Sequence, residues 1–454
     1  MRVEQYRSYA LGSQPKWISS YISSMSFDLY ICDYVIDVLK AHVIELGESG
    51  NLSTKVVSKL LEVLEDFDCT EVRGTYEDIH EAIEYHVSKR TAEGKWLNLG
   101  KSRNDQVATA LRMRVREEML DLMDSLIVLL KEMVTKAAAY TDVPFPAFTH
   151  FQPAQPTTFG HYLLNFAEEI IDITSIIFGA YEFIDKCPMG SAAVAGSTVP
   201  VNRSRICEKL CFKDLAMNTI YATTSREFMV ASLQVLQLLS LVLWRFLEDM
   251  FLFSNPMVGL VEVPSSHAGT SSIMPHKRNP ATLEIARAEL AKVNSVLQEF
   301  MLTLKGLPSG YCLDLQQLSP SLWEAFRRFR RTVIVIADFV REVEVGKGVE
   351  RAFSYPLRAA DVAEYLSMKK GIPFREAYKR VALAVKEHGY DMDAIERSVL
   401  GEERLEDPIA SRRNLGSPGN WRPILNKVLN GIEELVKFVS NEWSRIGRCY
   451  DSLK

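Results

Sequence analysis

The chain has 454 residues, of which 47% are hydrophobic and 24% are charged, and its formal net charge is −5. This length is ample for a large core and favours two or three domains. The negative charge argues against general nucleic-acid binding, because nucleic-acid-binding surfaces carry an excess of basic residues.

Cysteine and histidine usage argues against a disulfide-rich protein and against a zinc-binding protein. The seven cysteines are scattered and form no CxxC pair, which favours a reduced, cytosolic protein without a disulfide framework or zinc site. The eight histidines show no HExxH motif, and there is no glycine-rich phosphate loop. No metal and no nucleotide cofactor is therefore predicted. Residues 1–14 are mixed polar, so no signal peptide is expected.

Helical periodicity dominates the chain from the N-terminus onward. Residues 1–102 contain short helical patterns, such as 28–46 and 53–66, and are predicted to form an N-terminal helical domain. From 104 to 140, apolar residues recur every three or four positions without glycine or proline. At about 1.5 Å per residue, such a helix would be about 55 Å long.

Long uninterrupted patterns continue through the centre of the chain. They occupy 157–185, 225–254, 280–305 and 320–346. Five long helices predict an elongated bundle, which we assign to 103–348. Shorter helices follow in a C-terminal domain, 349–454. Because strand-like alternation is almost absent, the expected fold class is all-α.

Two segments of these helices have alternative interpretations. The apolar stretch 228–244 is interrupted by serines and glutamines, which favours a helix buried in the bundle over a membrane span. The basic cluster 327–331 lies in a helical pattern. A solvated helix face or a subunit contact is the preferred interpretation, rather than nucleic-acid binding.

The first polar stretch that could carry chemistry is 100–106, just before the first long helix. Ser102 and Asp105 are spaced as a capping box. Arg103 and Asn104, next to a helix N-terminus, could instead form a carboxylate receptor, because a guanidinium matches a carboxylate in a bidentate way. Both interpretations stay open.

The second stretch, 148–156, lies between two long helices, and its prolines keep it non-helical. His150 is the group best matched to proton transfer near neutral pH. A histidine that is simply part of a polar surface is the alternative.

The third stretch is Gly269-Thr-Ser-Ser-Ile-Met-Pro-His-Lys-Arg-Asn-Pro280. It suits a loop that closes over an anion, with Lys277 and backbone N–H groups facing the negative charge. Asn279 and Pro280 are interpreted as an N-cap and the first helical residue. Glu284 follows about one turn later and could fix the tautomer of His150. A well-capped helix with a first-turn acid is the alternative.

The fourth stretch, 307–317, connects the fourth and fifth long helices. Tyr311 and Gln316 could bind a polar ligand there, and a simple connector is the alternative.

Taken together and in this order, these stretches resemble the argininosuccinate lyase family of the fumarase/aspartase superfamily. The resemblance covers nearly the whole chain, including 24–28, 190–202, 225–228 and the C-terminal third. It implies an all-α homotetramer around a twenty-helix core, with each active site drawn from three subunits and no cofactor. The implied reaction is the reversible elimination of argininosuccinate to arginine and fumarate.

The resemblance also implies roles for individual residues. Ser271 would be the base, supported by Lys277, and His150 paired with Glu284 would be the acid or the group that orients it. The residues that would hold the fumarate part are Ser102, Arg103, Asn104, Thr149 and Asn279. The residues that would hold the rest are Ser24, Asp28, Arg226, Tyr311 and Gln316.

Three positions depart from the family pattern. Thr270 replaces the usual glycine before the paired serines, and Leu313 stands where a basic residue is common. The sequence His276-Lys-Arg278 is similar to that of adenylosuccinate lyase, which is the nearest rival enzyme. A non-catalytic structural role, as in delta-crystallin, is the rival from another class; retention of the four catalytic candidates argues against it.

Overall fold

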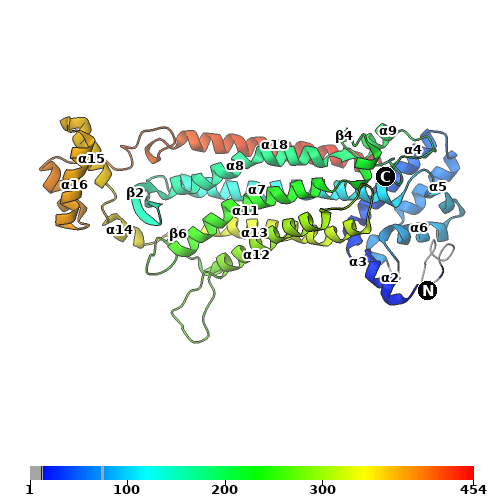
Figure 1. Ribbon diagram of the computed structural model, residues 1–454, viewed down its shortest axis with the longest axis horizontal. Coiled ribbons are helices and arrows are strands. Elements are labelled where there is room, and N and C mark those ends of the chain that lie inside the picture. Colours follow the sequence, from blue (N-terminus) through cyan, green and yellow to red (C-terminus); the bar gives the residue numbers. More distant parts are fainter. Residues whose placement is uncertain (1–11, 13, 73–75, 454) are drawn as a thin grey trace.

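The computed structural model describes residues 12, 14–72 and 76–453, so most of the stretch 1–14 considered for a signal peptide lies outside the described residues. A helical N-terminal region occupies one end of an elongated bundle, and a small helical unit occupies the other (Figure 1). The described strands form three two-stranded sheets. This arrangement confirms the all-α fold class.

The N-terminal region consists of short helices around α4, which packs against α5 and α7. Its helices are α2 (Lys16–Ile22), α3 (Met25–Asp28), α4 (Cys32–Glu48), α5 (Thr54–Glu65) and α6 (Ile79–Arg90), with 3₁₀ turns at Leu29–Ile31, Cys69–Glu71 and Ala92–Trp96. The predicted helix over 53–66 is therefore confirmed, whereas the one predicted over 28–46 is divided, because a 3₁₀ turn precedes α4.

The five predicted long helices are confirmed, with boundaries within four residues of those expected. They are α7 (Arg103–Ala139), α8 (Phe159–Ile184), α11 (Glu227–Phe253), α12 (Ala281–Leu304) and α13 (Leu318–Glu342). Helix α11 is long and apolar enough to cross a membrane by composition, yet it packs between α8 and α12. Its predicted place as a buried bundle helix is confirmed.

Short elements connect these helices and follow them. They are β1 (Pro144–Thr149), β2 (Gln152–Thr158), β3 (Lys186–Cys187), α9 (Arg203–Lys209), β4 (Asp214–Leu215), α10 (Thr219–Thr224), β5 (Val261–Glu262) and β6 (Glu344–Val345), with 3₁₀ turns at Ser265–His267 and Leu313–Gln317. Beyond α13 come α14 (Gly348–Phe353), α15 (Ala359–Lys370), α16 (Phe374–His388) and α17 (Met392–Leu400), and then a 3₁₀ turn at Pro418–Asn420.

The expectation of only shorter helices after 348 is wrong. Helix α18 (Arg422–Ser452) has 31 residues and returns to pack on α7 and α8. Gly431 interrupts its sequence pattern, but a Cβ there would lie 2.5 Å from Ile171 Cγ2 of α8. The glycine therefore permits a close helix contact. Helices α15 to α17 enclose a small core of their own. The two domain boundaries, near 102 and 348, stay a prediction.

Two buried arginines fix the first half of α7. Arg116 donates to Asp185 Oδ1 at 3.0 Å and to the Cys211 carbonyl at 2.7 Å. Arg112 donates to the carbonyls of Phe183 and Ile184 at 2.9 and 3.0 Å. Because buried charges are costly unless they are hydrogen-bonded, these contacts hold α7 in one position against the end of α8.

The prediction of a chain without disulfides is wrong. Cys32 is bonded to Cys69, and Cys211 is bonded to Cys449, whereas Cys187, Cys207 and Cys312 are free. The partners are 37 and 238 residues apart in sequence. Disulfide connectivity of this kind cannot be deduced from spacing alone. The first bond joins the start of α4 to the 3₁₀ turn at Cys69–Glu71. The second joins the end of α18 to the segment after α9.

The basic cluster 327–331 on α13 is paired with acidic side chains. Arg328 forms ion pairs with Glu289 and Glu324, and Arg330 lies 3.1 Å from Glu118. These contacts account for the cluster as part of a charged helix surface.

Candidate active site

Six of the predicted substrate-binding residues line one cavity of about 120 Å³ near the N-terminus of α7. They are Ser24, Asp28, Arg103, Asn104, Tyr311 and Gln316. Gln316 also donates to the Ile22 carbonyl at 2.9 Å, which ties the connector after α12 to the N-terminal helices. The fold thus joins three segments that are far apart in sequence. We call this the α7 cavity.

The start of α7 is fixed by the capping box that the sequence predicted. Ser102 Oγ accepts from the Asn104 N–H, and Asp105 Oδ1 accepts from the Ser102 N–H at 3.0 Å. Asp105 Oδ2 also accepts from the N–H groups of Gly190 and Ala192. Ser102 itself does not line the α7 cavity. The positive end of the helix dipole and Arg103 nevertheless face the cavity, a favourable place for a carboxylate.

Asp28 is a buried carboxyl at the other side of the α7 cavity. Burial raises its pKa from 3.8 to about 7, against the opposing effect of a hydrogen bond from Ser24. That bond, from Ser24 Oγ to Asp28 Oδ2, is 2.6 Å long. A cationic ligand would favour the charged form of this carboxyl.

Arg226 lies behind the α7 cavity and is only 1% exposed. Its Nη1 donates to the Ser225 carbonyl at 2.8 Å, and its Nε has no partner among the described residues. Burial lowers the pKa of this guanidinium to about 10. It lines a small adjoining cavity together with Tyr311 and Gln316. Contact between Arg226 and a ligand stays a prediction.

Sequence reasoning missed three residues that line the α7 cavity: Glu77, Asp78 and His80. Asp78 accepts from Arg103 Nη1 at 2.8 Å. Neither ring nitrogen of His80 has a hydrogen-bond partner in the described chain, and burial lowers the pKa of this histidine to about 4. Asp78 is the N-cap of α6, and that signal could have drawn attention to the segment. Leu313, the departure from the family pattern, also lines the cavity.

His150 occupies the two-residue turn of the β1–β2 hairpin, with Phe151. Thr149 pairs with Gln152 across the turn, and both turn residues have positive φ, 54° and 57°. This geometry normally favours asparagine and glycine. Each left-handed non-glycine residue costs on the order of 1–3 kcal/mol, and such strain clusters at functional sites. The turn presents Thr149 and His150 exposed at the end of the bundle.

Ser271 and Lys277 lie on a loop that projects from the side of the bundle before α12 (Figure 1). Ser271 Oγ accepts from the N–H groups of Met274 at 3.1 Å and Ile273 at 3.4 Å. Two backbone donors therefore already face this oxygen. Lys277 is exposed.

The predicted N-cap at Asn279 is wrong. Helix α12 begins at Ala281, and the residue at its N-cap is Pro280. Asn279 instead exchanges backbone hydrogen bonds with Gly269, at 2.8 and 2.9 Å. Gly269 is also not needed for a left-handed backbone, because its φ is not positive. A Cβ there would lie 3.1 Å from Ala281 Cβ, so the glycine permits close approach.

Within one chain, the three groups of candidate residues do not meet. Helix α7 has 37 residues between the α7 cavity and the β1–β2 hairpin, a separation of about 55 Å. Helix α12 separates the Ser271 loop from Tyr311 by 24 residues, or about 36 Å. His150 makes no hydrogen bond with Glu284 among the contacts of the described residues.

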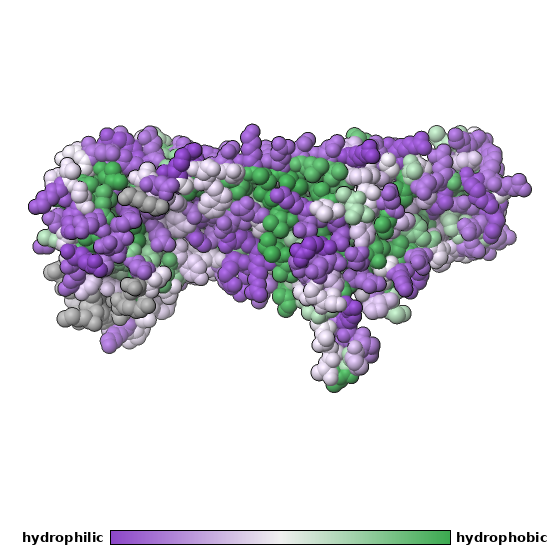
Figure 2. Space-filling view, turned by 180° about the vertical axis from the view of Figure 1, so that it is seen from behind, coloured by the Kyte–Doolittle hydropathy of each residue, from purple (hydrophilic) through white to green (hydrophobic). Residues whose placement is uncertain are grey.

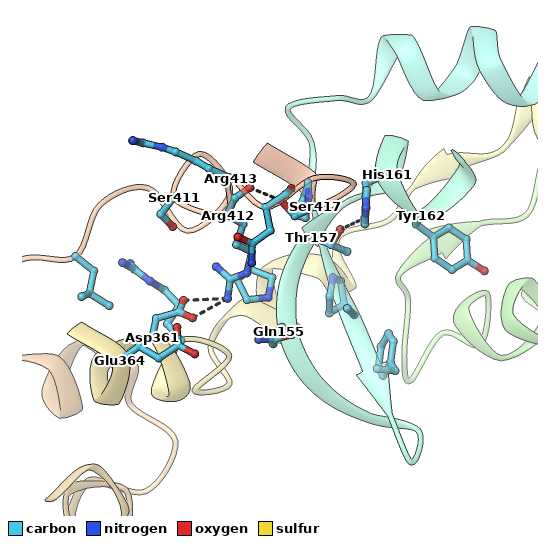
Figure 3. Close-up of a pocket in the computed structure, with 18 of the residues that line it drawn as sticks. Gln155, Thr157, His161, Tyr162, Asp361, Glu364, Ser411, Arg412, Arg413 and Ser417 are labelled. Carbon is cyan, nitrogen blue, oxygen red and sulfur yellow. Dashed lines mark hydrogen bonds and ion pairs between the residues drawn. The ribbon is translucent and has the colours of Figure 1, made fainter. Parts of the chain in front are cut away.

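A larger cavity, about 1010 Å³, lies between the β1–β2 hairpin, α8 and the unit formed by α15 to α17 (Figure 3). At its edge, Arg412 Nη2 donates to both carboxylate oxygens of Asp361 of α15, at 2.7 and 3.0 Å. None of the predicted catalytic or binding residues lines it. Among the described residues, no group of three histidine, cysteine or acidic side chains is placed to hold a metal ion.

Solved structures of two enzymes have the same architecture as this chain. An EDDS lyase variant with bound fumarate matches with a TM-score of 0.82 and 21% identity, covering 94% of this chain and 91% of that chain. A class II fumarase from Schistosoma mansoni matches with a TM-score of 0.73 and 15% identity, covering 82% and 87%. The chain therefore has the fold that these two enzymes share.

Sequence relatives narrow the class to one family. The Lyase family model matches residues 12–294, and the model for the argininosuccinate lyase C-terminal region matches 356–410. Argininosuccinate lyase from Sulfolobus acidocaldarius is 40% identical over 376 residues, covering 83% of each chain. The one from Pyrococcus furiosus is 38% identical over 442 residues, covering 94% of this chain and 95% of the relative. The chain belongs to the argininosuccinate lyase family and is a carbon–nitrogen lyase.

Proposed function

We propose that the chain catalyses the reversible elimination of argininosuccinate to arginine and fumarate, at active sites formed between subunits of a homotetramer. The observation that carries the proposal is the α7 cavity, where a guanidinium and a helix N-terminus face the buried carboxyl of Asp28. An elongated substrate with carboxylates at one part and a guanidino group at another matches both kinds of group.

The binding roles follow from the charges of the cavity. Arg103 and Asn104, at the positive end of α7, hold the carboxylates of the fumarate part together with Ser102. Thr149 and Asn279 complete this part from other subunits. Ser24, Asp28, Tyr311 and Gln316 hold the arginine part, with Arg226 behind them. Leu313 contributes an apolar wall where related sequences commonly have a basic residue.

The chemistry is a proton abstraction followed by loss of the guanidino group. Ser271 Oγ removes the proton from the carbon next to one succinate carboxylate, and the electron pair is held as a doubly negative aci-carboxylate. That pair then forms the double bond of fumarate while the C–N bond breaks. The leaving nitrogen takes up a proton, which His150, oriented by Glu284, supplies.

Serine is a poor base at its ordinary pKa, so its alkoxide needs local stabilisation. The N–H groups that point at Ser271 Oγ are donors of the required kind. Lys277 adds a positive charge on the same loop. Donors that are already oriented stabilise developing charge most effectively, because they need not reorganise during the reaction.

The shared sites require other copies of the chain, and the surface of the bundle supports this. Apolar side chains gather along the bundle and at the tip of the projecting loop (Figure 2). Ile285 and Leu302 of α12 are 64% and 73% exposed, and Ile273 at the loop is 83% exposed. Exposed apolar patches of this kind mark protein–protein contacts.

The enzyme is proposed to be cytoplasmic. Helix α11 is accounted for by its place in the bundle. The two disulfides are compatible with this location, because intracellular proteins of hyperthermophiles can be disulfide-rich.

The acidic limb of the pH profile is expected to depend on Asp28. Its pKa of about 7 means that the carboxyl becomes neutral as the pH falls below 7. A neutral carboxyl binds a guanidinium less well, so kcat/KM is expected to fall about tenfold per pH unit below 7. The profile of kcat/KM for argininosuccinate between acid and neutral pH measures this.

Asp28→Asn is expected to lower kcat/KM at pH 8 and to remove the acidic limb near pH 7. Asp33→Asn serves as the matched control, because Asp33 is an exposed carboxylate on the adjacent helix α4. If Asp28→Asn kept the limb in place, Asp28 would not be the group that titrates.

The substrate assay tests the proposed function as a whole. Purified protein is given argininosuccinate or adenylosuccinate while the ultraviolet absorbance of fumarate is followed. Turnover of argininosuccinate is expected. Turnover of the purine substrate alone would assign the rival activity, and turnover of neither would favour a structural role.

A further inference from the structure

The loop that carries Ser271 has a neck that is tightly held to the bundle. The neck is the pair Gly269 and Asn279, whose backbones exchange two hydrogen bonds, and nine residues, 270–278, lie beyond it. Before the neck, β5 pairs with β6, the strand that follows α13. After the neck, α12 begins at Ala281. The start of the loop is therefore held near the end of α13 by the β5–β6 pair, and the end of the loop continues directly into α12.

His267 is the buried side chain that joins these attachments. It is 4% exposed and lies two residues before the neck. Its Nδ1 is hydrogen-bonded to Thr282 Oγ1 of α12 at 2.9 Å, and its Nε2 to Asp338 Oδ2 of α13 at 3.2 Å. The ring also packs edge-on against Phe339, with centroids 5.3 Å apart. The imidazole of His267 thus connects the segment before the neck with α12 and with α13.

Beyond the neck, the loop has few contacts with the rest of the chain. Ile273 is 83% exposed, and Ser271 Oγ bonds only within the loop. Arg278 is the last residue before the neck, and it donates to the Val263 carbonyl at 2.8 Å and to Ser265 Oγ at 3.1 Å, both on the incoming side. The residues from 271 to 277 are therefore free to adjust while the neck stays fixed.

We propose that His267 is a positioning residue, which fixes the direction in which the loop leaves the bundle and so places Ser271 over a substrate bound to another subunit. The inference rests on the proposed function of Ser271 as the base. A base must lie within about 3 Å of the proton it removes, and a small misplacement costs a large factor in rate. A polar side chain at this buried place is costly unless it is bonded, and His267 is bonded on both sides.

The test compares variants that remove the hydrogen bonds but keep the packing. His267→Phe preserves the aromatic contact with Phe339 and removes both ring nitrogens. It is expected to lower kcat for argininosuccinate by about 10-fold or more, while KM changes by less than about threefold, because the α7 cavity is untouched. Thr282→Val removes the bond to Nδ1 and Asp338→Leu removes the bond to Nε2, and each variant is expected to lower kcat in the same direction by a smaller factor.

Ser266→Ala is the matched control. Ser266 is exposed and bonds to Glu342 of α13, but it does not reach the outgoing helix. Its kcat is expected to stay within about twofold of wild type, since such surface changes are usually nearly neutral.

Amide hydrogen exchange at the neck gives a second measurement that does not depend on activity. The Gly269 and Asn279 amides are expected to exchange faster in His267→Phe than in wild type, with α7 and α11 unchanged. A His267→Phe variant with wild-type kcat and wild-type exchange at the neck would overturn the proposal. If that variant fails to fold, wild-type kcat and wild-type exchange at the neck in both Thr282→Val and Asp338→Leu would overturn the proposal instead. If wild type lacks argininosuccinate turnover, the proposed function fails, and the exchange result alone then decides whether His267 holds the neck.

Discussion

Ser271→Ala is expected to lower kcat for argininosuccinate by about 10²- to 10⁴-fold, the range over which a general base contributes. The effect on KM is expected to be small, because the proposed substrate-binding residues Arg103, Tyr311 and Gln316 line a cavity in a different part of the chain. The fold and the assembly are expected to persist, since the hydroxyl bonds only to N–H groups of its own loop. Steady-state kinetics and light scattering measure the two properties.

Ser272→Ala is the natural control for this variant. Ser272 is adjacent to Ser271 and exposed on the same loop, but no hydrogen bond of its side chain is seen in the described structure. Its turnover is expected to stay within about threefold of wild type. Near-normal turnover in Ser271→Ala, with loss in Ser272→Ala, would transfer the role of base to the second serine.

Cys449→Ser is expected to cause a large loss of stability. The bond between Cys211 and Cys449 closes a span of 238 residues, for which the chain-entropy model gives on the order of 5 kcal/mol. It also holds the end of α18 beside the buried pair of Arg116 and Asp185. Thermal unfolding in the absence of reductant is expected to occur at a lower temperature in the variant.

Counting thiols tests the same bonds directly. The denatured wild-type chain, kept unreduced, is expected to have three reactive thiols, those of Cys187, Cys207 and Cys312. Cys312→Ser is the control and is expected to unfold at the wild-type temperature within error. Seven reactive thiols per chain would mean that neither disulfide forms in solution.

The long helices could be predicted because their information is local. The stretch from Asn104 to Tyr140 contains no glycine or proline, and its apolar period is that of a helix. Helix α18 was missed because Gly431 interrupts the pattern for a reason that lies on α8, in its close contact with Ile171. A glycine required by packing looks the same in sequence as a glycine that ends a helix.

In the candidate site, too, the features set by neighbouring residues could be predicted, and those set by distant contacts could not. The capping box of Ser102 and Asp105 was predictable because it spans four consecutive residues. The pairing of Asn279 with Gly269 was not, because it joins the two ends of a loop that are distant in sequence. The inclusion of Asp78 and His80 in the α7 cavity depends on how the N-terminal helices pack against α7, which no single segment encodes.

The family pattern explains why residues from separate ends of the molecule were expected in one site. The structure describes one chain, in which the α7 cavity, the β1–β2 turn and the Ser271 loop lie apart (Figure 1). If these groups act together, a subunit must lend its loop to the cavity of another. The strained turn at His150 and the exposed tip at Ile273 are both features that contact with a neighbouring subunit would use.

Mixing two inactive variants tests this sharing most directly. Arg103→Ala removes the guanidinium of the α7 cavity, and Ser271→Ala removes the proposed base, so an assembly made of either variant alone is expected to be inactive. Co-expression of the two chains with different tags, followed by isolation of mixed assemblies, is expected to restore about a quarter of wild-type activity, since a random fraction of sites receives both intact residues from different subunits. Mixed assemblies as inactive as their parents would show that one chain supplies both residues and would contradict the shared site.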